Sequence, residues 1–500
     1  MRIKISKRIN KSSEISNRKI LVLLIIICIA AALIRFYLLE KGTFWLDETY
    51  SWERGRLTLA GLLNLFLDSN SSMILHYFLL HFWLYLGDSE FIIRSLSVIF
   101  GIASIPAIYF LGSKLFGKKA GLICSILLAL HSFHVHYSQE ARSYSLLVLL
   151  VILSSYFFIR AVESPKKTKF WVLYIVSSVL AVYSHTFVIL ILFAQLLSLN
   201  RKIILHITSK VLLKVIGFLI LFILPLIVIM RLHSKGGGSS WIVQPTPEKL
   251  LEFFYQLTGN FGITLFLIYF ILIFIAVLYF PSKITDSENS SRLKLYYKFL
   301  ILWLAFPILT AYLVSLVKPI FVNRYLLMCL PSLILLASHG LVKLYYLRLG
   351  VFRIFPPALV LIVSLSSLGL NRYFFDKENN LNEWKNLATY LYSKQRLGDG
   401  IYLTHDCNPF HYHLKQRIKI TNNRFLPEEI YPYPLTNVGN TVNGYKRILL
   451  ISHVDKKYEE IEMIRMALNN NFQLQEKKVF EGFGINTGST AIVSELYAKK

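Results

Sequence analysis

The chain has 500 residues, of which 55% are hydrophobic and 16% are charged, and its formal net charge is +26. Soluble globular chains carry about 25% charged residues, so the composition excludes an ordinary water-soluble protein and indicates a membrane protein. The basic residues lie mainly in short segments between apolar runs. Because the positive-inside rule places them there, the charge does not indicate a nucleic-acid-binding protein.

The N-terminal part predicts one span and then a polar outer segment. A basic stretch, 1–19, precedes an apolar run over 20–38, and no small-residue cleavage site comes before the polar block at Glu40. We therefore predict a retained first span with a cytoplasmic N-terminus. In the outer loop 39–90, the apolar run 73–86 is shorter than the about 20 residues that a span needs. We expect an interfacial or re-entrant helix there.

The later apolar runs complete a membrane domain over residues 20–370. The run 170–199 has basic residues at both ends, so we predict two short spans that turn at residues 183–186. Together with single spans elsewhere, this gives about eleven transmembrane helices. The other predicted spans are 91–112, 119–137, 142–160, 212–231, 261–280, 299–317, 326–345 and 353–370. The C-terminus then lies outside a cell membrane, which we expect to be a bacterial inner membrane.

From residue 371 to 500 the chain becomes polar and periodic, which predicts a small extracytoplasmic α/β domain. Apolar residues at helical spacing predict two helices, at 383–395 and 456–469. Runs rich in β-branched and aromatic residues predict strands at 400–404, 447–453, 472–480 and 490–494.

Metal and disulfide sites are not indicated by the residues that could form them. Three of the four cysteines lie inside apolar runs, and no pair has the spacing of a metal knuckle. His131, His134 and His136 recur at three- and two-residue spacing, which on a helix is a poor arrangement for zinc.

Four polar clusters, far apart in the sequence, all fall at the outer surface in the predicted topology. They are Trp45–Glu48, Tyr137–Arg142, His185 and Asn323–Tyr325. Their two arginines suit the oxygens of a phosphate, and a carboxylate can accept the proton of a hydroxyl. The clusters therefore indicate a site for an anionic, membrane-borne substrate.

Each cluster also has a purely structural explanation. Asp47 and Glu48 could cap an outer helix, and Arg142 and Arg324 could extend from span ends to the membrane surface. A histidine such as His185 is more often a satisfied interfacial residue than a catalyst or a ligand.

The motifs in order resemble one family of membrane enzymes. FWLDE after the first span, HSFHVHYSQEARSYSLL, VYSHTF and NRYLLMCLPSLILL resemble the GT-C glycosyltransferases. The closest branch is that of protein O-mannosyltransferases and bacterial aminoarabinose transferases, glycosyltransferase family 39. The resemblance runs over about residues 20–345, and NEWKNLATYLYSKQRLGDGIYL at 382–403 resembles the start of that branch's C-terminal region.

This resemblance implies transfer of a sugar from a polyprenyl-phosphate-linked donor to an unidentified envelope acceptor, which is a glycan, lipid or protein hydroxyl. It implies that Asp47 is the general base and that Glu48 orients the acceptor or binds the donor. Arg142 and Arg324 would hold the lipid phosphate. Further candidates for substrate binding are Gln139, Glu140, Tyr144, His185 and Tyr325.

The resemblance leaves two features open. Some GT-C enzymes require a divalent metal and others do not, and Asp47 and Glu48 are too few ligands to imply one. Relatives usually carry prolines before the short outer helix, where this chain reads Asn70-Ser71-Ser72-Met73. The shape of the acceptor groove is therefore not implied.

Three other classes compete with a glycosyltransferase. A transporter or flippase of lipid-linked sugars would place ionisable residues near the bilayer midplane and show internal repeats, and neither is evident. A polymerase or ligase of the O-antigen type would share the donor but not the acidic pair after the first span. An inactive scaffold would not need both acids and both arginines.

Overall fold

The structure is a computed structural model that describes most of the chain. The described residues are 4–5, 16–68, 73–232, 242–260, 262–278, 287–345, 347–349, 352–378, 383–394, 396, 399–403, 412–413, 428–430, 444–453, 458–484 and 488–500. Residues 70–72, where the prolines of relatives are missing, lie outside them. The chain forms two compact units, described separately below. The membrane unit comprises Met1–Leu39 and Arg54–Tyr373, and the sheet unit comprises Glu40–Glu53 and Phe374–Lys500.

Among the described residues, seven helices are long and apolar enough to cross a membrane. Two further spans arise if each of two bent helix pairs counts as one: α6 (Lys118–Leu130) with α7 (Ser132–Ser138), bent by 62°, and α13 (Pro247–Leu257) with α14 (Gly262–Leu278), bent by 73°. The seven are α1 (Asn17–Phe36), α5 (Glu90–Phe116), α8 (Tyr144–Glu163), α12 (Ser209–Leu232), α15 (Ser287–Ser315), η2 (Asn323–Cys329) continued by α16 (Leu330–Leu344), and α17 (Phe355–Glu378).

The described residues thus support seven to nine spans, fewer than the predicted eleven. The run 170–199 does divide into two helices, α9 (Thr168–Ser184) and α10 (Val188–Ser198), with the break at 185–187. At about 1.5 Å per residue, α10 is about 17 Å long, little more than half of the bilayer's hydrocarbon thickness. Both helices are shorter than the about 20 residues typical of a span.

A buried hydrogen-bond network holds these two short helices against α8. The hydroxyl of Tyr174 donates to Oε1 of Gln195 at 2.8 Å, and the amide of Gln195 donates to Oγ of Ser154 at 3.3 Å. Ser154 and Ser178 also share a hydrogen bond of 2.8 Å. Because unsatisfied polar groups are costly in an apolar interior, these contacts favour one relative position of α8, α9 and α10.

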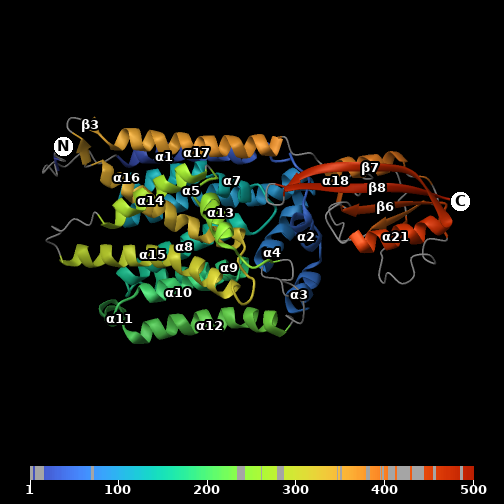
Figure 1. Ribbon diagram of the computed structural model, residues 1–500. Helices are drawn as coiled ribbons and strands as arrows, with labels where there is room; N and C mark the ends of the chain where they lie inside the picture. The colour runs from blue at the N-terminus through green and yellow to red at the C-terminus, as the bar shows by residue number, and fades with distance from the viewer. Residues whose placement is uncertain are drawn as a thin grey trace. The chain divides into compact units, whose positions relative to one another are not determined.

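The interior of the membrane unit is formed by η2–α16, α8 and α5, whereas α1 and α12 are largely exposed along their apolar faces (Figure 1). Helices α5 and α6 approach closely because glycines face each other at their contact. A Cβ atom on Gly121 would lie 2.7 Å from the backbone oxygen of Tyr109, and one on Gly112 would lie 2.9 Å from Sγ of Cys124.

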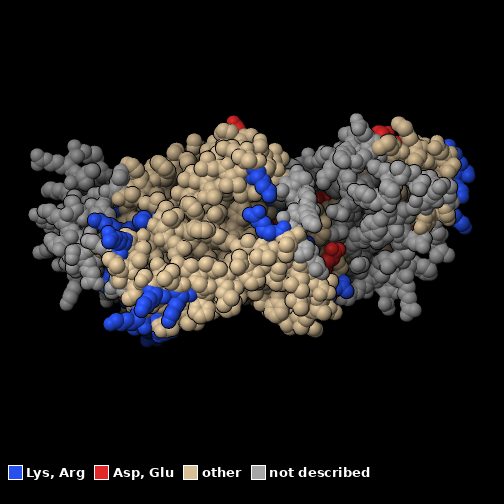
Figure 2. All heavy atoms as spheres, turned by 90° about the horizontal axis from the view of Figure 1, so that it is seen from below, with Lys and Arg blue, Asp and Glu red and all other residues tan. Residues whose placement is uncertain are grey.

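The two ends of the membrane unit differ in their elements and in their charge. One end carries α11 (Arg201–Ile207) and a small sheet of β1 (Lys4–Ile5), β2 (Leu347–Leu349) and β3 (Phe352–Arg353). The other carries α3 (Leu59–Asp68), α4 (Ile74–Trp83) and η1 (Leu84–Leu86). Lys and Arg gather at the α11 end on the face in Figure 2. The prediction of a short helix at 73–86 is confirmed by α4 and η1.

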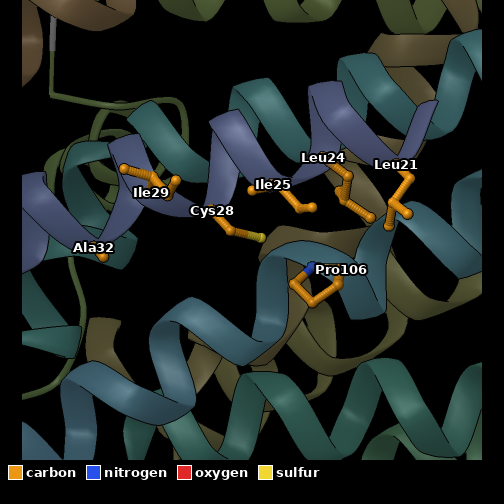
Figure 3. Close-up of a pocket in the computed structure, with 7 residues that line it drawn as sticks. All are labelled: Leu21, Leu24, Ile25, Cys28, Ile29, Ala32 and Pro106. Atoms are coloured by element: carbon orange, nitrogen blue, oxygen red, sulfur yellow. The ribbon is translucent and has the colours of Figure 1, made fainter. Parts of the chain in front are cut away.

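An apolar groove lies between α1 and α5 and has a volume of about 380 Å³. Six side chains of α1 face Pro106 of α5 across it, and none of them is charged (Figure 3). The lining is therefore almost entirely hydrocarbon, with the thiol of Cys28 as its one sulfur group.

The sheet unit contains a mixed sheet with a helix on each face. Its strands follow the order β5 (Glu428–Ile430), β4 (Asp399–Leu403), β6 (Arg447–His453), β8 (Gly488–Lys499) and β7 (Phe472–Gly484). The first three are parallel, and β8 is antiparallel to both of its neighbours. Alternate residues of β6 contribute to two cores: Leu449 and Ile451 pack with α18 (Glu383–Lys394), and Ile448 and Leu450 pack with α21 (Tyr458–Asn471).

The secondary structure predicted for residues 383–494 is therefore confirmed, although β7 and β8 are longer than expected. The short strand β5 was not predicted. It has only 3 residues, too few to show an alternating pattern.

Candidate active site

Two arginines of the membrane unit meet at one tyrosine hydroxyl. Arg54, in the last turn of α2 (Leu46–Gly55), donates from Nη1 to the hydroxyl oxygen of Tyr77 at 2.8 Å. Arg142, just after α7, donates to the same oxygen at 3.4 Å. Tyr77 lies on α4 and is 1% exposed. Two guanidinium groups are thus concentrated around one buried phenol.

The neighbouring residue on α4, His76, is fully buried beside Arg142. Its ring also lies near the backbone of Ala141. Burial lowers the pKa of His76 to about 3, and the charge of Arg142 acts in the same direction. The imidazole is therefore neutral at physiological pH.

A second part of the cluster forms where the α9–α10 break meets η2. The ring of His185 packs on that of Tyr325 at a centroid distance of 4.6 Å and lies 6.4 Å from that of Tyr144. Burial lowers the pKa of His185 to about 3, and the charges of Arg142 and Arg324 lower it further. The backbone N–H of Phe187 donates to Nδ1 of His185, so the proton of the neutral ring lies on Nε2.

Gln139 joins three segments of the membrane unit. Its side-chain nitrogen donates to the backbone oxygens of Arg35 at 2.9 Å and Tyr37 at 2.7 Å. Its side-chain oxygen accepts from the hydroxyl of Tyr373 at 2.7 Å. The next residue, Glu140, lies 3.2 Å from Nε2 of His136. These contacts fix the segment that presents Arg142.

The bend between α6 and α7 depends on Arg35, which is fully buried in the last turn of α1. Its guanidinium donates to the backbone oxygens of Leu128 and Ala129, at the C-terminal end of α6, at 3.2 Å and 3.1 Å. A cation is favourable at the negative end of a helix dipole. Arg35 also bonds Nδ1 of His134 at 2.8 Å. The three closely spaced histidines thus do not converge: His134 faces Arg35, and His136 faces Glu140.

The acidic pair lies in the sheet unit, at the start of α2. Asp47 and Glu48 occupy the first turn of this helix, where the dipole favours negative charge. Glu48 is 1% exposed, whereas Asp47 is only partly buried. Nearby, Phe44 stacks on Tyr412 at 4.5 Å and Trp52 packs edge-on against the same ring at 5.0 Å. Aromatic contacts therefore anchor the segment that carries the acids.

Comparison with known proteins gives a match at the level of a family. Residues 71–232 match the model of a family described as dolichyl-phosphate-mannose-protein mannosyltransferase. This range contains α4, Arg142 and His185. None of the curated proteins matches the chain at the sequence level.

Solved structures share the fold over nearly the whole chain. ArnT from Cupriavidus metallidurans, bound to undecaprenyl phosphate, aligns with a TM-score of 0.59 and 11% identity over 96% of this chain and 98% of its own. Archaeal AglB from Archaeoglobus fulgidus, an oligosaccharyltransferase, gives 0.53 and 11% over 96% and 74%. Mycobacterial arabinofuranosyltransferase AftD gives 0.52 and 14% over 98% of this chain and 42% of its own.

The chain has the fold of the GT-C membrane glycosyltransferases, and its residues 71–232 match a mannosyltransferase family. The resemblance that its motifs indicated is therefore confirmed. Arg142 and Arg324 are both close enough to His185 for their charges to lower the pKa of its ring.

The sequence analysis did not identify Arg54, His76 or Tyr77 as members of the site. Arg54 is seven residues beyond Asp47 on the same helix, and His76 and Tyr77 lie in the apolar run that was predicted to form an interfacial or re-entrant helix. The polar residues in that run were the available signal. Among the described residues of this chain, no three His, Cys, Asp or Glu side chains form a group that could hold a metal ion.

Proposed function

We propose that this glycosyltransferase moves a sugar from a polyprenyl-phosphate-linked donor to a hydroxyl of an envelope acceptor. The observation that carries the proposal is the set of three guanidinium groups around Tyr77 and His185. Arginine's planar fork matches phosphate oxygens. The solved relatives support this donor class, because ArnT was determined with undecaprenyl phosphate and AglB with a dolichol-phosphate.

The proposed reaction is a single displacement at the anomeric carbon. The acceptor oxygen forms the new bond to C1 as the bond between C1 and the phosphate oxygen breaks. The electron pair of that bond remains on the phosphate, whose charge grows from one to two units. Arg142 and Arg324 stabilise the added charge more in the transition state than in the ground state. The anomeric configuration is inverted.

In this proposal Asp47 accepts the proton of the acceptor hydroxyl, and Glu48 orients the acceptor. Asp47 suits the role of base because it is the more exposed of the two acids. The same helix, α2, also carries Arg54, seven residues later. Gln139, Glu140, Tyr144 and Tyr325 support the site, since all four lie within or beside the two segments that present Arg142 and Arg324.

We place the reaction on the extracytoplasmic side. The α11 end of the membrane unit is rich in Lys and Arg, and basic ends face the cytoplasm in most membrane proteins. The tyrosine of the candidate site lies on α4, at the other end. In this orientation, the enzyme would use a donor that had already crossed the membrane.

The test is transfer of a labelled sugar by the purified protein in detergent. Radiolabelled sugars on polyprenyl phosphate are supplied with host membranes as acceptor, to wild type, Asp47→Asn and the control Glu481→Gln on β7. We expect label on an acceptor with wild type and the control, and its loss with Asp47→Asn. Full activity of Asp47→Asn would show that Asp47 is not the general base. If wild type instead moves intact donor between the leaflets of liposomes and transfers no sugar, the protein is a flippase and the proposal is wrong.

A further inference from the structure

The hydroxyl of Tyr77 has one hydrogen and two lone pairs. The lone pairs accept from Nη1 of Arg54 and Nη1 of Arg142. In the described part of the chain, the hydroxyl hydrogen itself is donated to no group. With 1% of the residue exposed, bulk water is not a ready acceptor either. A buried donor without an acceptor costs about 1–3 kcal/mol, so the position favours a ligand that supplies one.

The chemistry of the surroundings defines that ligand. Both groups bonded to the phenol are cations, which can only donate hydrogen bonds. His76 on the same helix is fully buried. His76 is also close enough for the charge of Arg142 to act on it. A group with several acceptor oxygens and negative charge would accept the hydrogen of the phenol and be attracted to the two guanidinium groups beside it.

We propose that Tyr77 donates a hydrogen bond to the phosphate of the polyprenyl-phosphate donor, and that Arg54 is the third guanidinium of this phosphate site. This inference rests on the proposed function and adds residues that the motifs of the family did not indicate in this sequence. Of the two substrates in the proposed reaction, the donor is the one that brings such a group, because its phosphate combines acceptor oxygens with negative charge.

The arrangement makes Tyr77 a stronger donor than an isolated tyrosine. Hydrogen bonds in a chain polarise one another, and the two guanidinium groups draw electron density from the phenol oxygen. As the bond between C1 and the phosphate oxygen breaks, the phosphate gains charge and the Tyr77 hydrogen bond strengthens. The proton stays on Tyr77 throughout, because Asp47 takes the proton of the acceptor hydroxyl.

A structural explanation of Tyr77 is that it merely separates Arg54 from Arg142. The two explanations differ in what they predict for binding. If Tyr77 is only a spacer, Tyr77→Phe should be less stable, but its affinity for the phosphate should not fall selectively. A phosphate ligand predicts weaker binding of undecaprenyl phosphate but not of undecaprenol, which has the same chain and no phosphate.

The experiment measures binding of both lipids and steady-state transfer with the full-length protein in nanodiscs. For Tyr77→Phe we expect about 10- to 100-fold weaker binding of undecaprenyl phosphate, as for loss of a hydrogen bond to a charged group, with undecaprenol unchanged and kcat reduced. The control is Tyr85→Phe on η1, where the tyrosine is 79% exposed. Arg54→Gln should also weaken phosphate binding, and it tests the site if Tyr77→Phe does not fold.

If Tyr77→Phe and Arg54→Gln both bind the two lipids as tightly as wild type does, the inference is overturned. An equal loss of affinity for both lipids would mean that Tyr77 is only a spacer, and this too would overturn the inference. If wild type binds undecaprenyl phosphate in preference to undecaprenol but transfers no sugar, the proposed function fails. The binding measurements would then still decide whether Tyr77 and Arg54 contact a phosphate.

Discussion

The hydroxyl of Tyr373, near the end of α17, donates a hydrogen bond of 2.7 Å to the side-chain oxygen of Gln139, 234 residues earlier in the chain. Because the amide nitrogen of Gln139 donates to backbone oxygens at the end of α1, one side chain connects α1, α17 and the segment of Arg142. Gln139→Ala should therefore destabilise the protein by about 2–4 kcal/mol, as three buried hydrogen bonds are lost. Thermal unfolding in detergent measures this change.

Tyr373→Phe is the matched control, since it removes one of the three bonds and should cost about 1 kcal/mol. The sequence analysis proposed Gln139 as a substrate-binding residue. Normal stability of Gln139→Ala together with weakened donor binding would support that role and contradict the structural one.

The sequence was sufficient to predict most helices and strands but not the bends. Helices such as α5 and α8 follow from about 20 apolar residues in succession, which is a local property. The bend at His131 depends instead on Arg35, nearly 100 positions away, which binds the last carbonyls of α6. The bend before α14 includes Asn260 with a φ of 59°. Neither the contact made by Arg35 nor the φ angle of Asn260 can be predicted from hydropathy.

The site was predictable to the extent that it follows from topology. Arg142, Arg324 and His185 were expected at one membrane surface, and the charges of both arginines act on His185 in the structure. Tyr77 was not predicted, because its significance lies in sharing one oxygen between Arg54 and Arg142, and a sequence does not show such pairings. The roles of Asp47 and Glu48 in catalysis remain predictions.

Conservative changes of the two candidate phosphate ligands should impair the reaction. Arg142→Lys and Arg324→Lys keep the charge but lose the planar fork. We expect kcat to fall about 10- to 1000-fold, with a smaller change in KM, because the phosphate gains charge in the transition state. Initial rates at varied donor concentration give both constants. Arg201→Lys, an exposed residue of α11, should behave as wild type. An unchanged kcat in both variants would exclude these arginines from the reaction.

The acidic pair should separate into two roles. Asp47→Asn removes the proposed base and should reduce kcat about 100- to 10,000-fold, while donor binding is retained. Glu48→Gln should raise KM for the acceptor more than it lowers kcat, because the proposed role of this residue is to orient the acceptor. Steady-state kinetics with each substrate varied in turn measures these effects. The reverse pattern, with kcat lost only in Glu48→Gln, would exchange the two assignments.

Acidification should destabilise the protein partly through His185. Its pKa is lowered to about 3 by burial and by the two arginines, against about 6.5 in an unfolded chain. Between these values the unfolded state binds the proton and the folded state does not, so stability falls as pH decreases below about 6.5. One such group lowers the free energy of unfolding by about 1–2 kcal/mol when the pH falls from 7 to 5.

His185→Gln removes this contribution. The difference in unfolding free energy between pH 7 and pH 5 should therefore be smaller in the variant than in wild type by about 1–2 kcal/mol. Denaturant unfolding in a mild detergent at the two pH values provides the comparison. An identical pH dependence in both proteins would mean that His185 does not remain neutral as the pH falls.

A pair of glycine substitutions tests the packing beneath the site. A Cβ atom on Gly101 of α5 would collide with the side chain of Ser138 and lie 3.2 Å from Nε of Arg35. Gly101→Ala should therefore cost about 1–3 kcal/mol of stability and reduce transfer, because Ser138 directly precedes the segment of Gln139 and Arg142.

Gly217 of α12 has no atom within 4 Å of the same position, so Gly217→Ala should be neutral or stabilise the helix by up to about 1 kcal/mol. Thermal unfolding of both variants makes the comparison direct, since the chemical change is identical. Equal effects at the two sites would show that α5 can move away from Ser138, and the close contact at Gly101 would then not determine the position of Arg142.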